Sequence, residues 1–413
     1  NCLLLGAGGM GMAPLALYLR EAGSEVEAFD DSFREPIRGL LEKAGVRLLS
    51  EPFPNRRPDV VVRSSAVSED RPELLRWRNL GVPVYRRGDY LARLLVNRKI
   101  LAVVGSHGKT TTAAMITWLL HKAKYSFGYL VGGLFRDLNV LPAAYSEEAW
   151  VVVEVDESDG TIDSFQPEVT LALNCDWDHA DHYDSPQDFR DTLTSLFART
   201  KGCVLIPAGD ELEDLSRSSA CCQTMTFDSP LDDAAYNDRN ASAAFAACRA
   251  IDVEPVPDAL DDFPGLARRQ VLLGETSDRL ILEDYAHHPT EIKAVINSAR
   301  QIYKNRKIIC VFQPHRYSRV KSLENEFALS FKSSDTVVLC PVYSAGEKLK
   351  YKFNQNDFSQ LISKKSKTQV INIKNQRDLK NYFRMNLLDN EMVICMGAGS
   401  ISNWIREISE ELR

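Results

Sequence analysis

Short, continuous runs of Val, Ile and Leu recur along most of the chain and alternate with segments that carry a helical pattern. Examples are DVVVRSSAV, ILAVVGS, WVVVEVD, VTLALN, KIICVFQ and MVICMGAG. Strands that are apolar on both faces and separated by helices are typical of parallel sheets covered on both sides. The alternation therefore predicts an α/β fold along nearly the whole length.

The chain has 413 residues, which is more than one ordinary domain requires. Glycines follow apolar strands near Gly6, Gly105 and Gly397, so three separate α/β units are expected. Each should hold a mostly parallel sheet with flanking helices. The predicted domains are residues 1–98, 99–262 and 263–413.

Composition limits the possible partners. Hydrophobic residues make up 44% of the chain, and the formal net charge of −7 argues against a nucleic-acid surface. No apolar run approaches the roughly 18 residues that cross a membrane, and no leader peptide is visible. The nine cysteines form no CxxC pair, which favours buried free thiols. We expect a cytoplasmic small-molecule enzyme with no nucleic-acid partner and no membrane insertion, a monomer or weak homodimer.

The first strand leads into GAGGMG, in which Gly6, Gly8 and Gly11 fit the pattern G-x-G-x-x-G. Asp30 ends the next strand about 20 residues on, as in dinucleotide-binding units. Such glycines let the backbone approach a pyrophosphate, and the acid reaches a ribose hydroxyl. NAD, FAD and a UDP-sugar all carry a pyrophosphate, so this motif leaves the ligand open.

The stretch GSHGKTTT follows the strand LAVV and resembles a phosphate-binding loop. Lys109 would contact the β- and γ-phosphates, and the Thr110 hydroxyl would reach Mg²⁺. Val103 stands where the full motif has its first glycine, so the match is incomplete. The loop predicts ATP binding without deciding among a kinase, a motor, a switch and a ligase.

Acidic and imidazole side chains follow two further strands. EVDESDG places Glu154 at a strand end, and NCDWDHADHY delivers His179 among carboxylates. The carboxyl ends of parallel strands share one edge of a sheet, where the phosphate loop also lies. A carboxylate and an imidazole at that edge could bind the metal that bridges the phosphates.

Two more strands end in polar loops, DYAHHPTEI and FQPHRYSR. Arg316 and Arg319 lie three residues apart at a helix start, so both could face one anion, and paired guanidinium groups suit a carboxylate. The alternative is that they form an inter-domain salt bridge.

Together these motifs resemble the Mur ligases of peptidoglycan synthesis. The residues that carry the resemblance are GAGGMGM, SSAV, GSHGKTTT, EVDESDG, NCDWDHADHY, NDRNASAA, GLARR, DYAHHPTEI and FQPHRYSR, in the family's order. The resemblance implies a Rossmann-like N-terminal domain, a P-loop ATPase-like central domain and a Rossmann-like C-terminal domain. It also implies that ATP and Mg²⁺ are used to join L-alanine to the lactyl carboxylate of UDP-N-acetylmuramate through an acyl phosphate.

The resemblance also implies roles for individual residues. The catalytic residues would be Lys109, Glu154 and His179, and the metal ligands Thr110, Glu154 and His179. ATP would be bound by Gly105, Ser106, His107, Gly108, Lys109, Thr110, Thr111, Asn237, Asn240, Arg268, Arg269 and Asp284. The UDP-sugar would be bound by Gly6, Gly8, Gly9, Gly11, Asp30, Ser64 and Ser65. The amino acid would be bound by Tyr285, His315, Arg316 and Arg319.

Two departures from the family pattern concern the central domain. Ala234, Ala235 and Tyr236 replace the usual Gly-x-His before Asn237, and the connector before NDRNASAA is shorter than in relatives. The central domain is therefore expected to be shortened. The alternatives are a recycling ligase that adds a preformed tripeptide to the same sugar nucleotide, and an inactive nucleotide-binding regulator. A NAD-dependent dehydrogenase would explain GAGGMG alone and leave the phosphate loop unexplained.

Overall fold

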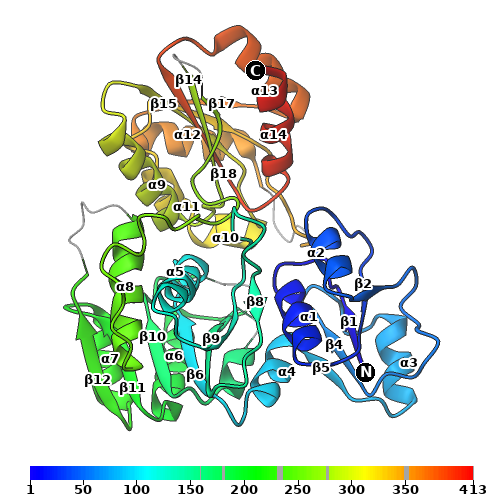
Figure 1. The fold of residues 1–413 in the computed structure, drawn as a ribbon. Coiled ribbons are helices and arrows are strands. Elements are labelled where there is room, and N and C mark those ends of the chain that lie inside the picture. Colours follow the sequence, from blue (N-terminus) through cyan, green and yellow to red (C-terminus); the bar gives the residue numbers. More distant parts are fainter. Residues whose placement is uncertain (159, 179–181, 230–235, 276–278, 348–352, 413) are drawn as a thin grey trace. The chain divides into compact units, whose positions relative to one another are not determined.

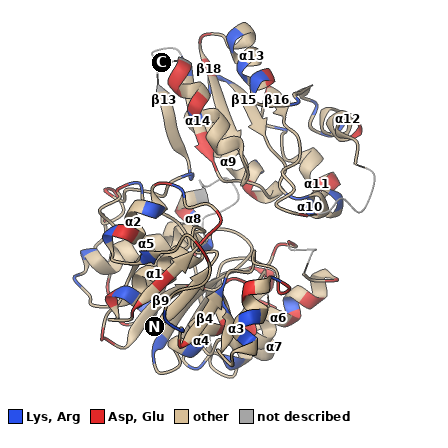
Figure 2. Cartoon of the chain, turned by 90° about the vertical axis from the view of Figure 1, so that its right-hand side faces the viewer, with Lys and Arg blue, Asp and Glu red and all other residues tan. Residues whose placement is uncertain are grey.

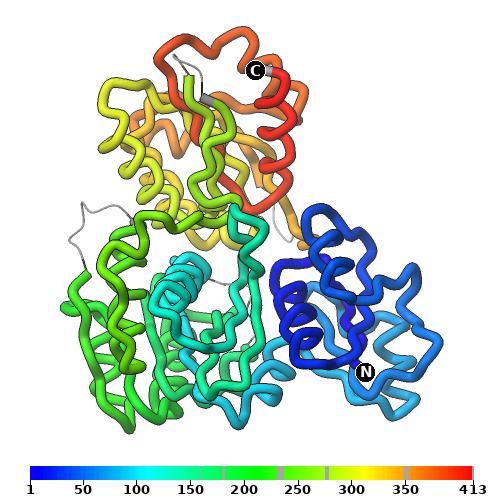
Figure 3. Tube along the Cα trace, in the orientation of Figure 1, coloured from blue at the N-terminus to red at the C-terminus, as the bar shows by residue number. Residues whose placement is uncertain are grey.

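The computed structural model describes residues 1–158, 160–178, 182–229, 236–275, 279–347 and 353–412. Three sheets follow one another along the chain, each flanked by helices (Figures 1 and 3). Among the described strands all pairs are parallel except β7–β8 and β13–β14. This confirms the predicted α/β class with three mostly parallel sheets. Within the described residues, no helix combines the length and the apolar character that a membrane span requires.

The N-terminal sheet has the strand order β3-β2-β1-β4-β5. Its strands are β1 (Cys2–Leu5), β2 (Val26–Phe29), β3 (Arg47–Leu48), β4 (Val60–Arg63) and β5 (Val84–Arg86). Its helices are α1 (Met12–Glu21), α2 (Ile37–Lys43), α3 (Pro72–Asn79) and α4 (Arg87–Leu94). The apolar strand β1 is fully buried at the centre, so the loop that follows it opens at the carboxyl edge of the sheet.

The middle sheet has the order β12-β11-β10-β6-β9-β7-β8. Its strands are β6 (Lys99–Val104), β7 (Gly128–Leu130), β8 (Ala143–Ala144), β9 (Trp150–Glu154), β10 (Val169–Ala172), β11 (Cys203–Pro207) and β12 (Gln223–Phe227). The helical segments are α5 (Lys109–Lys122), the 3₁₀ helix η1 (Thr161–Ser164), α6 (Pro186–Arg199), α7 (Glu211–Ser219) and α8 (Tyr236–Ala250). β6 lies between β9 and β10, so the loops after these three strands meet at one edge.

The C-terminal sheet has the order β13-β14-β18-β15-β16-β17. Its strands are β13 (Val271–Glu275), β14 (Arg279–Asp284), β15 (Lys307–Phe312), β16 (Thr336–Leu339), β17 (Gln369–Asn372) and β18 (Glu391–Met396). Its helices are α9 (Pro289–Ile302), α10 (Tyr317–Ser322), α11 (Glu324–Leu329), α12 (Gln355–Ser366), α13 (Gln376–Asn386) and α14 (Ile401–Leu412). Helices such as α6 and α13 carry charges of both signs (Figure 2), as solvated faces do.

The chain divides into two compact units. One comprises Asn1–Trp177, Ser185–Ser229 and Arg239–Gly265, and it contains both the N-terminal and the middle sheet. The other contains the C-terminal sheet, together with Asp178 and Asn237. Within the first unit, α4 packs on η1 so closely that a Cβ atom on Gly88 would collide with the Thr161 side chain. Only glycine permits this approach, which fixes α4 against the middle sheet.

Candidate active site

The phosphate loop, residues 105–111, connects β6 to α5 and depends on two glycines. Gly105 has φ +128° and Gly108 has φ +82°, both outside the range that side chains favour. A Cβ atom on Gly105 would also lie 3.0 Å from the backbone oxygen of Asn174. These turns bring the loop to the N-terminus of α5, which begins at Lys109, and a helix N-terminus attracts anions.

Hydrogen bonds fix the loop to the segment after β10. The Asn174 side chain accepts from the His107 amide at 2.9 Å and donates to the His107 carbonyl at 3.0 Å. The Ser106 hydroxyl donates to the Asp176 carbonyl at 2.5 Å, and His107 Nε2 lies 3.2 Å from the Asp176 carboxylate. The loop is therefore pre-formed by the protein's own groups, which reduces the entropy that ordering it around a ligand would cost.

Lys109 is held from two sides. Its Nζ donates to the Gly105 carbonyl at 2.6 Å and to Glu157 Oε1 at 2.8 Å, and Glu157 is fully buried. Burial alone would lower the pKa of Lys109, but Glu157, with Asp156 and Glu154, raises it above its usual range. The ammonium group therefore stays charged at neutral pH, as a phosphate contact must.

Thr110 and Glu154 meet at the edge of the middle sheet. The Thr110 hydroxyl donates to Glu154 Oε1 at 2.9 Å, and the Gly132 amide donates to Oε2 at 3.0 Å. Burial raises the pKa of Glu154, and the Lys109 charge partly offsets that effect. These two oxygen donors suit Mg²⁺. The third expected ligand, His179, lies outside the described residues, and the described part of the chain holds no group of three or more His, Cys, Asp or Glu arranged for a metal.

Other residues expected to bind ATP lie near the start of α5 or on α8. Thr111 is buried in the first turn of α5. Asn240 is buried, and its Oδ1 accepts from the Thr112 hydroxyl at 3.2 Å. Its Nδ2 atom is also buried and has no hydrogen-bond partner among the described residues. Asn237 is exposed and donates to Gln270 Oε1 at 3.3 Å. Asn240 thus retains a buried donor without a partner among the described residues, whereas the Asn237 amide is exposed.

The glycine-rich loop, residues 6–11, follows β1 and closes on Asp30. The Gly8 amide donates to Asp30 Oδ2 at 2.8 Å, and a Cβ atom on Gly8 would lie 3.0 Å from that carboxylate. Gly6 lies against Ser64, where a Cβ atom would come within 2.9 Å of Ser64 Cβ. The structure therefore brings Gly6, Gly8, Asp30 and Ser64 together. The remaining expected residues of this group are Gly9, which is open to solvent, Gly11, which lies against Arg87, and Ser65, which is exposed.

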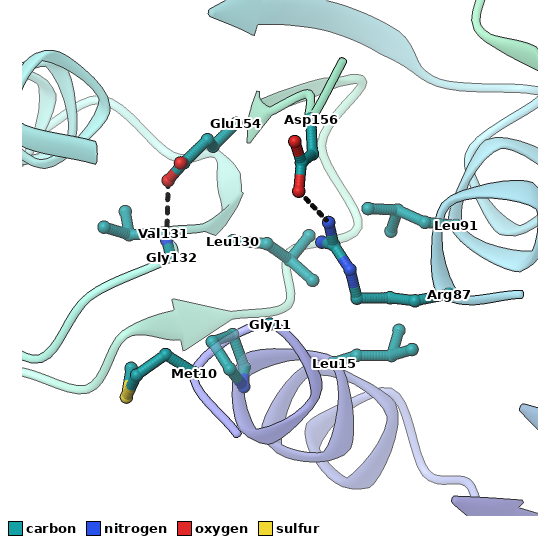
Figure 4. A pocket seen from close by; sticks show the side chains of 11 residues that line it. Met10, Gly11, Leu15, Arg87, Leu91, Leu130, Val131, Gly132, Glu154 and Asp156 are labelled. Atoms are coloured by element: carbon teal, nitrogen blue, oxygen red, sulfur yellow. Dashed lines mark hydrogen bonds and ion pairs between the residues drawn. The ribbon is translucent and has the colours of Figure 1, made fainter. Parts of the chain in front are cut away.

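A pocket lies between α1, α4 and the end of β9 (Figure 4). Its polar lining consists of Arg87, Glu154 and Asp156, with Gly11 and Gly132 on the backbone side. Its apolar lining consists of Met10, Pro14, Leu15, Leu91, Leu130 and Val131. The pocket thus connects the end of the glycine-rich loop with the carboxylate that contacts Thr110.

In the second unit, two arginines lie over one aromatic ring. The guanidinium carbons of Arg268 and Arg269 lie 4.7 and 5.0 Å from the centroid of Tyr285. Arg268 also lies 3.7 Å from buried Glu283. Burial raises the pKa of Asp284 to about 6, while Arg269 opposes this rise, and the carboxylate accepts from the Gln270 amide at 2.9 Å. These four expected residues therefore form one cluster, although the Asp284 oxygens are already engaged by backbone amides.

Four rings line the carboxyl ends of β14, β15 and β16. We call Tyr285, His287, His315 and Tyr343 the ring cluster, because neighbouring centroids are 5.2, 5.8 and 5.7 Å apart in that order. Burial lowers the pKa of His287 to about 3 and that of His315 to about 4. Both imidazoles are therefore neutral at neutral pH.

The two expected carboxylate-binding arginines differ. Arg319 is buried and donates to both oxygens of Asp178, at 2.7 and 3.0 Å, within the second unit. Arg316 precedes α10 with φ +66°, and its amide donates to the Tyr343 carbonyl at 3.3 Å. Such a φ is strained for a non-glycine residue and is common at functional sites. In this structure the Arg319 guanidinium is thus engaged by the Asp178 carboxylate.

Several residues at these sites were not predicted from the sequence. Glu157 and Asp156 lie in the quoted motif EVDESDG, and His287 lies in DYAHHPTEI, but no role was assigned to them. Arg87 and Tyr343 each follow an apolar strand, as the predicted residues do, and that placement is the signal that could have identified them.

Family models match most of the chain, in order. The Mur ligase family, catalytic domain, matches residues 3–99, the Mur ligase middle domain matches 103–249, and the Mur ligase, glutamate ligase domain, matches 268–399.

Curated relatives align over nearly the full length. A UDP-N-acetylmuramate–L-alanine ligase of Pelagibacter ubique is 31% identical over 98% of this chain and 97% of its own. One of Carboxydothermus hydrogenoformans is 33% identical over 96% and 93%.

Solved structures share the fold. The UDP-N-acetylmuramate-alanine ligase of Thermotoga maritima has a TM-score of 0.79 at 24% identity, covering 100% of this chain and 99% of that chain. A murein peptide ligase of Psychrobacter arcticus has a TM-score of 0.72 at 20% identity, covering 100% and 98%. At these identities the likeness concerns the fold alone.

Proposed function

This chain belongs to the Mur ligase family, and we propose that it uses ATP to join L-alanine to the lactyl carboxylate of UDP-N-acetylmuramate. The family membership confirms the resemblance and the ligase class that the sequence motifs predicted. The observation that carries the specific proposal is the pocket of Figure 4. It runs from the glycine-rich loop to Glu154, next to a pre-formed phosphate loop, so a sugar nucleotide and ATP could meet there.

The chemistry follows from the poor electrophilicity of a carboxylate. In the first step a lactyl carboxylate oxygen attacks the γ-phosphorus of ATP, the bond to the β-γ bridging oxygen breaks, and ADP leaves. In the second step the alanine amine attacks the acyl carbon, and the C–O bond to phosphate breaks. The amine loses a proton, so the products are an amide, ADP and inorganic phosphate.

The first unit supplies the groups for phosphoryl transfer. We assign Lys109 to the transferring phosphate, because its charged ammonium lies beside the loop at the start of α5. Thr110 and Glu154 would hold Mg²⁺, with His179 as the third expected ligand, and the ion would supply positive charge to the phosphates. Asn240 is assigned to the adenine because its buried Nδ2 has no partner among the described residues.

The second unit supplies the acceptor groups. We assign the ring cluster and Arg316 to L-alanine. The imidazoles of His287 and His315 are neutral at neutral pH, so they would contact the amino acid without adding a formal charge. Arg268, Arg269 and Asp284 remain assigned to ATP, as the family pattern implies. We place the reaction in the cytoplasm, where ATP is available, and expect a monomer or weak homodimer.

The test is phosphate release with purified protein, ATP, Mg²⁺ and UDP-N-acetylmuramate, with L-Ala, Gly, L-Ser or the tripeptide as acceptor. We expect the highest kcat/KM for L-alanine and no release when UDP-N-acetylglucosamine replaces the donor, since it lacks the carboxylate. Release with the tripeptide alone would assign the recycling reaction. Absence of release with every acceptor would assign an inactive homologue.

A further inference from the structure

Arg87 lies in the pocket of Figure 4 but belongs to no predicted site. It is the first residue of α4, and its side chain is 20% exposed. Its stem lies against Gly11, where a Cβ atom would come within 3.2 Å of Arg87 Nε. Its guanidinium points toward Asp156, beyond the end of β9 (Figure 4). Arg87 thus reaches from the glycine-rich loop toward the carboxylates beside the phosphate loop.

The Asp156 carboxylate lies too far from the Arg87 guanidinium to hold it by a hydrogen bond. Arg87 Nη2 lies 3.8 Å from Asp156 Oδ2, which is longer than a hydrogen bond. No hydrogen bond of the Arg87 side chain is found within the described residues. By contrast, the preceding Arg86 donates to Asp89 from Nε at 2.7 Å. A largely buried guanidinium with one loose ion pair retains unused donors, since arginine has five.

The charges of the pocket indicate what those donors would bind. Among the described residues that line the pocket, Arg87 is the single cation, and Glu154 and Asp156 are both acidic. Both acids would repel a substrate carboxylate that approached Glu154, and Arg87 is the side chain of the described pocket lining that offsets this repulsion. The Asp156 carboxylate already lies beside the guanidinium, so a carboxylate is the chemical group that this position accepts. Planar guanidinium groups bind carboxylates in a bidentate manner.

We propose that Arg87 binds the lactyl carboxylate of the donor nucleotide, and that Asp156 is the internal carboxylate that the substrate displaces. The inference rests on the proposed function and assigns a positioning residue to it. When the substrate binds, Arg87 would exchange a loose contact with Asp156 for a closer one. The carboxylate would then lie between Arg87 and the end of β9, on the side of the pocket that Glu154 borders.

The test compares two nucleotides that differ only in the lactyl group. Calorimetric titration would measure the affinity of UDP-N-acetylmuramate and of UDP-N-acetylglucosamine for the full chain. We expect Arg87→Ala to weaken UDP-N-acetylmuramate about 10- to 100-fold, as the loss of a charge-assisted hydrogen bond does. UDP-N-acetylglucosamine should bind as it does to the unmodified chain. Arg87→Lys should recover part of the loss, because an ammonium keeps the charge without the planar fork.

Two further variants sharpen the result. Arg86→Ala is the matched control, since it removes a neighbouring arginine that does not line the pocket, and it should alter neither affinity. Asp156→Asn should strengthen UDP-N-acetylmuramate binding a few-fold and leave UDP-N-acetylglucosamine unchanged, because the competing charge is gone.

Equal losses for both nucleotides in Arg87→Ala would overturn the proposal in favour of a diphosphate contact. An unchanged affinity for both nucleotides would also overturn the proposal, because Arg87 would then have a structural role alone. If the unmodified chain itself failed to bind UDP-N-acetylmuramate, the proposed function would fail instead, so the two failures are distinguishable.

Discussion

The phosphate loop of the middle sheet and the ring cluster of the C-terminal sheet lie at equivalent edges but are built in opposite ways. The loop is surrounded by carboxylates, and its cation Lys109 is paired with fully buried Glu157. The ring cluster contains neutral imidazoles and tyrosines, next to which Arg319 is paired with Asp178. One site is organised by charge pairs between the segments that follow β6 and β9, and the other by rings from three strand ends.

The difference indicates how each site should respond to change. A charge pair such as Lys109–Glu157 should fail as a unit, because removal of one partner leaves the other buried without that opposite charge. A ring cluster should lose function gradually, since each ring contributes contact area rather than a formal charge. The predictions below test that contrast.

The largest effect is expected for Lys109→Ala, which should reduce ligation at least about 1,000-fold, roughly 4 kcal/mol of transition-state stabilisation. UDP-N-acetylmuramate binding should survive, because its assigned loop belongs to another sheet. Turnover and calorimetric titration on the same preparation provide the measurement.

A double variant controls for the buried Glu157. Lys109→Met combined with Glu157→Gln removes both charges, so the fold should persist while activity stays absent. Turnover near that of the unmodified chain in either variant would contradict the assignment of Lys109.

The next largest effects concern the arginines. Arg316→Ala should raise the KM for L-alanine or lower kcat by about 30- to 1,000-fold, equivalent to about 2–4 kcal/mol, and leave ATP and sugar-nucleotide affinity unchanged.

Arg319→Ala should lower the free energy of unfolding by about 3–5 kcal/mol, because Asp178 would remain buried without its cation. Separate titrations of the three substrates and a denaturant unfolding curve would measure both effects.

The free energy of unfolding, rather than substrate affinity, should distinguish Arg319→Ala from Arg316→Ala. If Arg316→Ala weakened all three substrates equally, the amino-acid pocket would be misplaced. If Arg319→Ala kept full stability, the pair with Asp178 would contribute nothing to the fold.

A smaller effect concerns pH and the neutral histidines. Their folded-state pKa values, about 3 for His287 and about 4 for His315, lie below the usual value near 6.5. The stability they contribute is present above pH 6.5 and is lost as the pH falls toward those values. Between pH 7 and pH 5 the expected loss is up to about 2 kcal/mol each.

The Asp284 carboxyl group should raise the free energy of unfolding as the pH falls, opposite to the effect of the two histidines. Its pKa is raised to about 6, so protonation below that value favours the folded state by about 1 kcal/mol at pH 5. The net result should be lower stability at pH 5 than at pH 7, with a smaller difference in His287→Gln. Denaturant midpoints at the two pH values measure it. An identical loss in the variant and the unmodified chain would show that His287 is not responsible.

Sequence motifs were most informative where one contiguous stretch carried specific chemistry. The three sheets followed from the apolar strands, and the Thr110–Glu154 contact from strand ends that share an edge. The Arg319–Asp178 pair joins residues 141 positions apart, so no local pattern could reveal it. Tyr343 was missed because a tyrosine after a strand has no distinctive signature until its ring is seen to stack on His315.

The central claim is that the carboxylate of the donor is activated by phosphorylation, and isotope transfer tests it most directly. UDP-N-acetylmuramate labelled with ¹⁸O in both lactyl carboxylate oxygens would be incubated with ATP, Mg²⁺ and L-alanine, and the released phosphate analysed by mass. An acyl phosphate breaks at the bond between the acyl carbon and oxygen, so each phosphate should carry one ¹⁸O atom. Phosphate released without label, in step with amide formation, would contradict the proposed reaction.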